Sequence, residues 1–444
     1  MSVACNASPV KKSDFPQSPE RQLLERIVQQ YTGPHIVTIR EGLYAAVGYG
    51  VSNMILVDTG DGLVIIDTTD NQRVARKVLD DFKAISKASV KAIVYTHSHP
   101  DHILGCKAIY EKGVQVYAHE SFIRELSLQG QLGMSGAQRG AAMFGAMLLQ
   151  SERVAPNISA YPSPVAVQFI FEPVKPDSIV KPTEMFAGNT ASFTVGGVEF
   201  TLYHTPGETP DHTVVHIRQM DAVACGDIFY PSFPNLYTIR GCSPRPVQDW
   251  AEAQNRIIAL QPEYLLQGHG FPVRGKAEIK TVLSHYREAI QHVHNVALEA
   301  VQGFLPVDEA VQKACLPDHL AHLPYLIQSY GCVPYSVKSI INSYVGWFDG
   351  NPTNLSPLSR GELANEVIAL AGSADKVLNH AEKAQQQGRH QAALELCEMI
   401  LAGDPRNEKA RKLRVHSLLA LSYWTANGPT ANYYRSFAEK QMIE

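Results

Sequence analysis

Apolar and polar positions follow different patterns on either side of residue 300. Before it, short β-type apolar runs alternate with helical segments, and a Thr-Gly-Asp-Gly turn separates two such runs within residues 52–68. Further strands are predicted at residues 90–97, 114–119, 199–205, 213–219, 221–227 and 263–269. Strands that are interleaved with helices predict a layered domain of the α/β or α+β class, and we take α/β as the expected class.

The segment at residues 101–113 lies between two predicted strands and has the length of a helix, with Gly113 placed to end it. It begins inside a histidine-rich run, which we therefore expect at the point where a strand leads into a helix. Layered folds usually keep their chemistry at such strand ends.

After residue 300 the pattern is almost wholly helical, with breaks at residues 348–357 and 402–407. Residues 374–424 resemble a tetratricopeptide-type helix pair, in which Gly388 ends one helix and Asp404 and Pro405 form a turn. One such unit cannot bury its own apolar face, so we expect it to dock on the first domain or on a partner subunit. The alternative is an isolated helical tail.

These textures divide the chain into three expected parts. Residues 1–22 form an N-terminal arm, residues 23–300 form the α/β domain, and residues 301–444 form the helical region. The arm carries polar residues and prolines where a signal peptide needs a basic start and an apolar segment.

Composition narrows the class of protein. The 444 residues include 39 basic and 43 acidic side chains, and this net charge of −4 offers no positive field for nucleic acid. No apolar run approaches the roughly 18 to 20 residues that span a bilayer, so no integral membrane association is expected. Seven scattered cysteines without a CxxC pair indicate a reducing compartment, and the cytoplasm is the expected location.

One short run offers metal-ligand chemistry. His97, His99, Asp101 and His102 lie within six positions, and imidazole and carboxylate groups suit zinc and other first-row divalent ions. On a strand end His97 and His99 point the same way, whereas Asp101 and His102 lie beyond the turn and face the other side. The spacing therefore predicts two ions, and a merely polar loop would rarely gather this set by chance.

Two complete metal shells need further ligands, which the sequence offers at later strand ends. The candidates are Glu208, Asp227 and His269. A carboxylate at Asp227 can bridge two cations because both of its oxygens carry lone pairs. His204 and His212, on either side of Glu208, are competing candidates for this ligand, and residue type alone favours one of the histidines.

Two other residues near these strand ends have ordinary interpretations. His119 ends a predicted strand, and we expect a hydrogen-bonded structural histidine there because the ligand positions are already filled. Cys225 shares the face of Asp227 one step further in, where burial is expected rather than metal binding.

Taken together, the HSHPDH run, the TPGE turn, the GD carboxylate and the late GHG resemble the metallo-β-lactamase superfamily over approximately residues 35–300. The resemblance implies an αββα sandwich with a dinuclear site at the edge of its sheets. The usual pattern has a histidine after Thr-Pro-Gly. The glutamate at this place, Glu208, is a mark of the alkyl sulfatase branch, and the resemblance thereby favours Glu208 over its neighbours.

Two further stretches resemble the same branch. Asn235 and Arg240 are spaced as in the run with which alkyl sulfatases hold the sulfate group, and an amide and a guanidinium are good donors to such an anion. Residues 330–358 and 430–436 look like the helical dimerisation domain of these enzymes, which implies a homodimer.

The sequence also departs from the branch. The bridging carboxylate is normally a glutamate followed by asparagine, but here Asp227 precedes Ile228. The turn around Glu208 lacks the alanine and the second proline expected there, and the chain stops before the sterol-carrier-like domain of longer alkyl sulfatases.

The leading hypothesis is a hydrolase with two zinc ions per chain that cleaves an alkyl or aryl sulfate ester with a metal-bound hydroxide. Asp227 bridges the metals and Asp101 also orients the hydroxide, while Asn235 and Arg240 bind the small anionic substrate. Alternatives are hydrolysis of a lactone, thioester, phosphoester or β-lactam, a non-catalytic interaction protein stabilised by metal, and redox chemistry at two irons.

Overall fold

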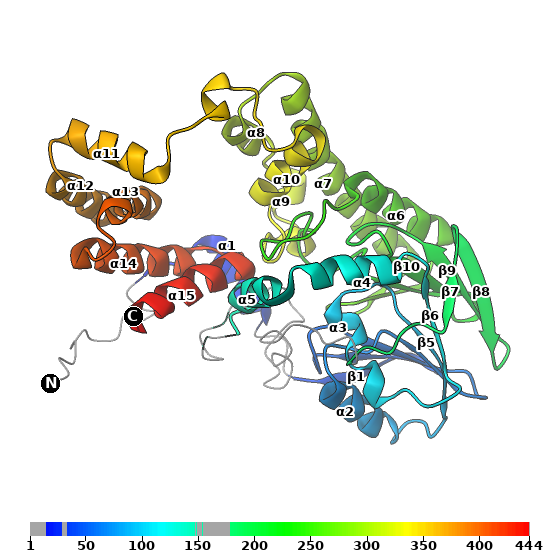
Figure 1. The fold of residues 1–444 in the computed structure, drawn as a ribbon. Helices are drawn as coiled ribbons and strands as arrows, with labels where there is room; N and C mark the ends of the chain where they lie inside the picture. The colour runs from blue at the N-terminus through cyan, green and yellow to red at the C-terminus, as the bar shows by residue number, and fades with distance from the viewer. Residues whose placement is uncertain (1–14, 29–32, 147, 149–152, 154–177, 444) are drawn as a thin grey trace, which may run out of the picture.

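Two β-sheets lie face to face with helices on both outer faces, and a helical region follows at one end of the molecule (Figure 1). This computed structural model describes residues 15–28, 33–146, 148, 153 and 178–443. The predicted αββα sandwich followed by a helical region is confirmed.

The first sheet contains seven strands in chain order, antiparallel from β1 to β4 and parallel from β4 to β7. Its strands are β1 (His35–Arg40), β2 (Leu43–Val47), β3 (Met54–Asp58), β4 (Leu63–Ile66), β5 (Val90–Val94), β6 (Gln115–His119) and β7 (Glu184–Phe186). The predicted turn is confirmed between β3 and β4, where Asp58 pairs with Leu63.

The second sheet contains six strands in the order β13-β12-β11-β10-β9-β8. They are β8 (Thr190–Val195), β9 (Val198–His204), β10 (Thr213–Ile217), β11 (Ala222–Gly226), β12 (Tyr264–Gln267) and β13 (Val273–Arg274). Among its described strands, β11 and β12 pair in parallel and the other neighbours pair antiparallel. Every strand predicted beyond residue 198 is therefore present.

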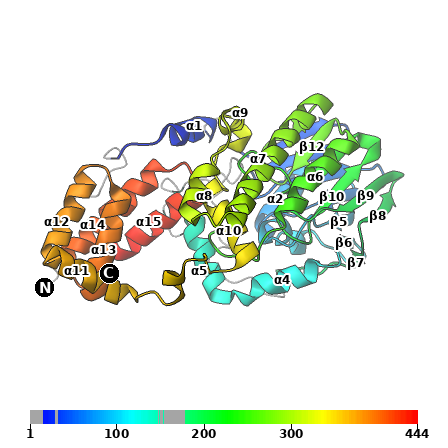
Figure 2. The same cartoon turned by 90° about the horizontal axis from the view of Figure 1, so that it is seen from above.

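Apolar residues fill three layers of this sandwich. Between the sheets, Val57 and Val94 of the first sheet share a core with Leu202 of the second. Outside the first sheet, α2 (Gln72–Phe82) buries Val78 and Phe82. Outside the second sheet lie α6 (Val247–Leu260) and α7 (Lys276–Gln302), which Figure 2 shows side by side. These layers do not occupy the strand ends at the edge of the sandwich, where polar side chains can gather.

The single helix expected at residues 101–113 is wrong. The structure has a short α3 (Pro100–Ile103) and a 3₁₀ turn (Cys106–Ala108) instead. The carbonyl of His102 accepts hydrogen bonds from the N–H and the hydroxyl of Thr68, and the N–H of Gly105 donates to Thr69. A Cβ at Gly105 would lie 1.8 Å from the Thr68 carbonyl oxygen, so this close approach to the end of β4 interrupts the helix.

The helical region continues the outer layer and then extends away from the sandwich. It contains α8 (Val307–Lys313), α9 (Asp318–Ala321), α10 (Val333–Val345), α11 (Arg360–Ala371), α12 (Ala374–Gln386), α13 (His390–Gly403), α14 (Glu408–Trp424) and α15 (Gly428–Ile443). The predicted helix pair is confirmed as α12 and α13, with Gly388 at a φ of +75° between them.

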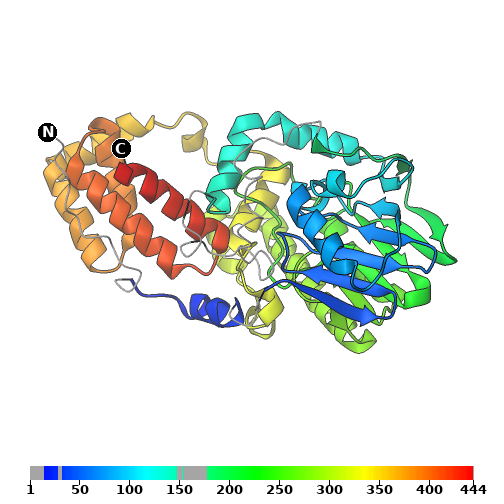
Figure 3. The same ribbon diagram turned by 90° about the horizontal axis from the view of Figure 1, so that it is seen from below.

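The helical region contacts the sandwich through α15, which follows the predicted unit at residues 374–424 and packs on its last helix, α14. Helices α4 (Phe122–Gln131) and α5 (Gly133–Met143) reach from the sandwich to α15, as Figure 3 shows in cyan and red. The side chain of Asn432 on α15 donates a hydrogen bond of 3.2 Å to the carbonyl of Met143. The helices described are all too short or too polar to cross a bilayer.

The N-terminal segment packs against this far end of the chain. Residues 1–14 of the predicted arm lie outside the described residues. From Phe15 onward the segment is ordered against the helical region: Phe15 stacks on Tyr423 at 5.2 Å, and the N–H of Ser18 donates to the carbonyl of Trp424. Helix α1 (Pro19–Val28) follows, and its Leu24 is buried against Ala431.

Candidate metal centre

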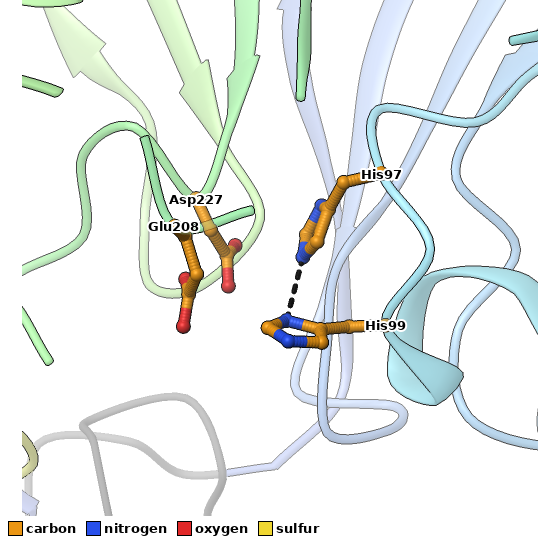
Figure 4. Close-up of side chains that lie close together, drawn as sticks. All are labelled: His97, His99, Glu208 and Asp227. Atoms are coloured by element: carbon orange, nitrogen blue, oxygen red, sulfur yellow. Dashed lines mark hydrogen bonds between the residues drawn. The ribbon is translucent and has the colours of Figure 1, made fainter. Parts of the chain in front are cut away.

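The predicted ligands meet in two groups at the strand ends of the sandwich. In the first group, His97, His99, Glu208 and Asp227 each offer an atom within 4.8 Å of the others, and these four side chains face one another in Figure 4. The second group contains Asp101, His102 and His269, again within 4.8 Å. The separation of His97 and His99 from Asp101 and His102 follows the predicted division.

Backbone hydrogen bonds between the two sheets hold these strand ends together. The N–H of Thr213, at the start of β10, donates to the carbonyl of Thr96 at 2.7 Å. The N–H of Asn53 donates to the carbonyl of Gly268 at 2.6 Å. The loops that carry His97 and His269 are thus fixed by main-chain contacts as well as by their own strands.

Several buried polar atoms at the centre have no hydrogen-bond partner among the described residues. They are Nε2 of His102, Oε2 of Glu208 and Oδ1 of Asp227. An unpaired buried polar group costs about 1–3 kcal/mol. Because all three atoms belong to the two ligand groups and are nitrogen or carboxylate donors, they fit divalent cations such as zinc.

Other atoms of the same side chains are held in place by the surrounding protein. Nδ1 of His102 lies 2.7 Å from Oδ2 of Asp67, and Nδ1 of His269 lies 2.8 Å from the carbonyl oxygen of Val51. In both histidines Nε2 is the nitrogen that faces the neighbouring carboxylates. A carboxylate or carbonyl on one ring nitrogen orients the other nitrogen toward a metal.

Burial and charge set the protonation of the centre when no cation is bound. Burial lowers the pKa of His97 and of His99 well below the usual value, so both imidazoles are neutral and available as ligands. Burial also lowers the pKa of His102, but the carboxylates of Asp227 and Asp67 outweigh it and hold that pKa well above its usual value. Cations must therefore displace a proton from His102.

The histidines on either side of Glu208, His204 and His212, make hydrogen bonds with the backbone. Nε2 of His212 accepts a hydrogen bond from the N–H of Asp227 at 3.0 Å. Nε2 of His204 lies 2.8 Å from the carbonyl oxygen of Pro210. In both histidines Nε2 therefore contacts a backbone atom. Glu208 is the residue of this turn that lies in the first ligand group.

The two residues set aside in the sequence have structural roles. Nδ1 of His119 is hydrogen-bonded to the hydroxyl of Ser121 at 2.7 Å, and its ring stacks on His204 at 3.6 Å between centroids. Cys225 is fully buried in the core beneath the second sheet, where burial raises the pKa of its thiol. The expected hydrogen bond of His119 and the expected burial of Cys225 are confirmed.

A cavity of about 560 Å³ opens above the ligands. Its apolar walls come from α4, α5 and the residues that flank α5, and they include Ile123, Leu126, Leu132 and Phe144. Its floor contains Asp101, Glu208, Asp227 and His269. An apolar chamber over a polar floor suits a ligand with an apolar body and an anionic or polar head.

Arg240 reaches this floor, and Asn235 lies buried on the same loop. Arg240 lines the cavity, and its Nη2 lies 3.3 Å from Nε2 of His99. The backbone N–H of Asn235 donates to the hydroxyl of Tyr230 at 2.7 Å. The side-chain nitrogen of Asn235 is buried without a partner among the described residues and is thus a spare donor.

Comparison with known proteins agrees with this architecture. The profile of the metallo-beta-lactamase superfamily matches residues 47–269, and the profile described as alkyl sulfatase dimerisation matches residues 306–442. A linear primary-alkylsulfatase of a Pseudomonas strain is 33% identical over 388 residues, which are 85% of this chain and 72% of that protein. The chain belongs to the alkyl sulfatase family of the metallo-β-lactamase superfamily.

Other alkylsulfatases resemble the chain over most of its length. An (R)-specific secondary-alkylsulfatase of Pseudomonas is 28% identical over 89% of this chain and 61% of its own length. The solved structure of a stereoselective inverting sec-alkylsulfatase from Pseudomonas has a TM-score of 0.85 at 26% identity, covering 97% of this chain and 69% of that one. The chain is therefore a member of a group of metal-dependent hydrolases, and it spans about 60 to 70% of the length of several of these relatives.

Two residues at this candidate site were not predicted from the sequence. Nη1 of Arg245 donates to Oε1 of Glu208 at 2.5 Å, and the arginine is buried. Tyr330 lines the same cavity although it lies within the region matched by the dimerisation profile. Neither residue follows a predicted strand, so no local pattern indicated that it reaches the centre.

Asp67 was missed although the sequence held a usable signal. It directly follows β4, as Asp227 directly follows β11. Carboxylates at strand ends are candidate metal ligands, so Asp67 meets the same criterion. Its oxygens accept from the N–H and the hydroxyl of Thr96 and contact His102, so it orients a ligand rather than lying in either ligand group.

Proposed function

We propose that this protein is a dinuclear zinc hydrolase that cleaves the sulfate ester of an alkyl or aryl alcohol. The observation that carries the proposal is the pair of ligand groups on the floor of an apolar cavity, with the Arg240 guanidinium beside them. The relatives named above are alkylsulfatases, which supports the same substrate class.

Seven residues are proposed to hold two zinc ions per chain: His97, His99, Glu208 and Asp227 for one, and Asp101, His102 and His269 for the other. Divalent cations held by these residues would lower the pKa of a bound water from 15.7 towards about 7 and would so supply a hydroxide at neutral pH. Asp227 is proposed as the bridging ligand. Its Oδ1 lies 3.5 Å from Nε2 of His102 and its Oδ2 lies 3.1 Å from Nε2 of His269, so it contacts the second group as well.

Asp101 is proposed to bind metal and to orient the attacking group. Its Oδ2 lies 3.6 Å from Nε2 of both His102 and His269, and the residue lines the cavity. A carboxylate oxygen at this place accepts a hydrogen bond from a nucleophile on the cavity floor. Asp101 is therefore placed to fix the direction in which that nucleophile faces the ester.

Arg240 and Asn235 are proposed to hold the sulfate group. The guanidinium of Arg240 reaches the cavity floor, and the Asn235 amide nitrogen has no competing acceptor among the described residues. Donors that are fixed before the substrate arrives stabilise the negative charge that develops as the ester bond breaks. The apolar walls then receive the alcohol part of the ester.

The first test joins metal content with sulfate release. We expect about two zinc ions per chain, sulfate release from a panel of alkyl and aryl sulfates, and loss of that release with a chelator. Arg240→Ala should reduce turnover far more than it reduces metal content. Two metals per chain with activity only on lactones, thioesters, phosphoesters or β-lactams would contradict the sulfate assignment while keeping the metal centre.

The second test addresses the number of metal sites. The variant carrying both His97→Ala and His99→Ala removes two donors from one group only. We expect it to bind about one zinc ion per chain at the second group instead of two. Loss of both ions, or retention of both, would contradict the proposed assignment of ligands to separate sites.

We also propose a homodimer formed through the helical region. The match to the dimerisation profile supports it, as does a series of exposed apolar side chains from the end of α10 to α11. The series contains Tyr344, Val345, Trp347, Leu355, Leu358, Leu363 and Leu370. Exposed apolar residues gathered in one segment indicate a protein interface. A cytoplasmic location stays a prediction of the sequence.

A further inference from the structure

Helix α5 is attached to the loop that carries Arg240. Arg139 on α5 donates from Nε to the carbonyl of Arg240 at 2.8 Å and from Nη2 to the carbonyl of Ile239 at 2.6 Å. Its guanidinium thus spans two successive peptide groups. A planar fork on two acceptors fixes both the position and the rotation of those groups, which a single donor cannot do.

The loop that carries Arg240 has little regular structure of its own to fix the position of these peptide groups. Residues 235–241 belong to no helix or strand, and a turn closes them with a hydrogen bond of 3.0 Å from the N–H of Gly241 to the carbonyl of Thr238. Gly241 has a φ of +100°, so the backbone leaves the turn in the left-handed region directly after Arg240. The direction in which the Arg240 side chain points therefore depends on outside contacts.

A second contact joins the same helix and loop. The hydroxyl of Thr238 lies 3.2 Å from the sulfur of Met143, the last residue of α5, and both side chains are buried. The carbonyl of Met143 in turn accepts the hydrogen bond from Asn432 of α15. Asn432 is fully buried, and a Cβ at Gly145 would come within 3.0 Å of it, so the fit at this junction is tight.

We propose that α5 positions the anion-binding arginine, with Arg139 as the positioning residue for Arg240 and with Asn432 anchoring the helix to the helical region. This inference rests on the proposed function, because it takes Arg240 as the sulfate contact. It adds a role for the helical region at the centre: the far end of the chain determines where the clamp lies. Arg139 itself is exposed, and its described hydrogen bonds reach the carbonyls of Arg240 and Ile239 rather than a proposed metal ligand, so it acts through the loop that carries Arg240.

The test measures binding of inorganic sulfate to the zinc-loaded full chain by isothermal titration calorimetry. Arg139→Ala should weaken sulfate binding on the order of 10-fold, because a displaced clamp no longer meets the anion. Arg139→Lys, which can reach only one of the two carbonyls, should give a smaller loss. Arg124→Ala is the matched control: this arginine is also exposed and lies on α4, and sulfate affinity should not change.

A double variant separates positioning from general damage. In the Arg240→Ala background, Arg139→Ala should cause no further loss of sulfate affinity, since its effect passes through the missing guanidinium. Zinc content and the melting temperature should be the same for Arg139→Ala and the unaltered protein.

Each contrary result has a distinct meaning. Equal sulfate affinity of Arg139→Ala and the unaltered protein, or additive losses in the double variant, would overturn the positioning role and leave the clamp intact. Undiminished sulfate binding by Arg240→Ala, or none by the unaltered protein, would overturn the clamp itself and this inference with it.

Discussion

Glu208 faces two ways: its Oε1 accepts a 2.5 Å hydrogen bond from Arg245, while its Oε2 is buried in the ligand group with no partner among the described residues. Burial raises the pKa of Glu208 to about 8, although the Arg245 charge opposes that rise. The arginine therefore orients the carboxylate and also favours the ionised form that a cation needs.

Replacing Arg245 by methionine leaves the Glu208 carboxylate buried without its charged partner. We expect the free energy of unfolding to fall by about 3–5 kcal/mol and the zinc affinity by about 10- to 100-fold. Chemical denaturation and competition with a chelator measure the two effects.

A double variant provides the control for this pair. Glu208→Gln combined with Arg245→Met removes both charges, so most of the stability should return while the zinc affinity stays low. Full zinc affinity in Arg245→Met would show that Glu208 needs no such orientation.

The candidate ligands at the strand ends could be predicted from the sequence because they lie directly after apolar runs typical of strands. His97 and His99 follow β5 and His269 follows β12, so the period of two and the apolar runs were sufficient to place them together. Glu208 was different. Residue type alone favoured His204 or His212, and the family resemblance pointed to Glu208, which the structure places in the first candidate ligand group.

The remaining features depend on contacts between distant segments. Arg245 and Tyr330 reach the centre only because α6 and the helical region pack against the second sheet. The break after α3 depends on backbone bonds from Thr68, which no helix propensity encodes. Interactions of this kind have no periodic signature in the sequence.

Asp211 gives the protein a pH-dependent stability. It is buried beside Ser98, whose hydroxyl donates to it at 3.2 Å, and burial raises its pKa to about 7. An unfolded aspartate titrates near 3.9. Because the folded pKa is the higher one, the contribution of Asp211 to stability is complete below about pH 4 and is lost as the pH rises to about 7.

Asp211→Asn should therefore reduce the loss of stability between pH 5 and pH 8. The difference between the two proteins should change across this window by up to about 3 kcal/mol. Any cost in stability from burying the asparagine amide is the same at every pH. The slope of the free energy of unfolding against pH is therefore the quantity to compare, measured by denaturation with a chelator present. Parallel stability curves would show that Asp211 does not titrate in this range.

The exposed apolar series between α10 and α11 should hold the dimer together. Trp347 is 74% exposed and Leu370 is 89% exposed. Trp347→Ser combined with Leu370→Glu should shift the protein from dimer to monomer in analytical ultracentrifugation, because the interface loses apolar area and gains a charge. Met185→Ser, at a 53% exposed position on β7, is the control and should leave the mass unchanged. An unaltered dimer in the double variant would place the interface elsewhere.

The apolar wall on α5 should set the size of the alcohol that the site accepts. Ala137 lines the cavity next to Gly136 and Gly140, and these small residues leave room above the candidate metal centre. Ala137→Leu fills that room, and such overpacking costs about 1–3 kcal/mol for a ligand that needs the space. The KM for a long-chain alkyl sulfate should rise about 10-fold, while the KM for a short-chain sulfate should change little. Gln138→Leu adds the same apolar side chain at an exposed neighbouring position and should alter neither value. Equal effects of Ala137→Leu on long and short substrates would mean that the alcohol lies outside this cavity.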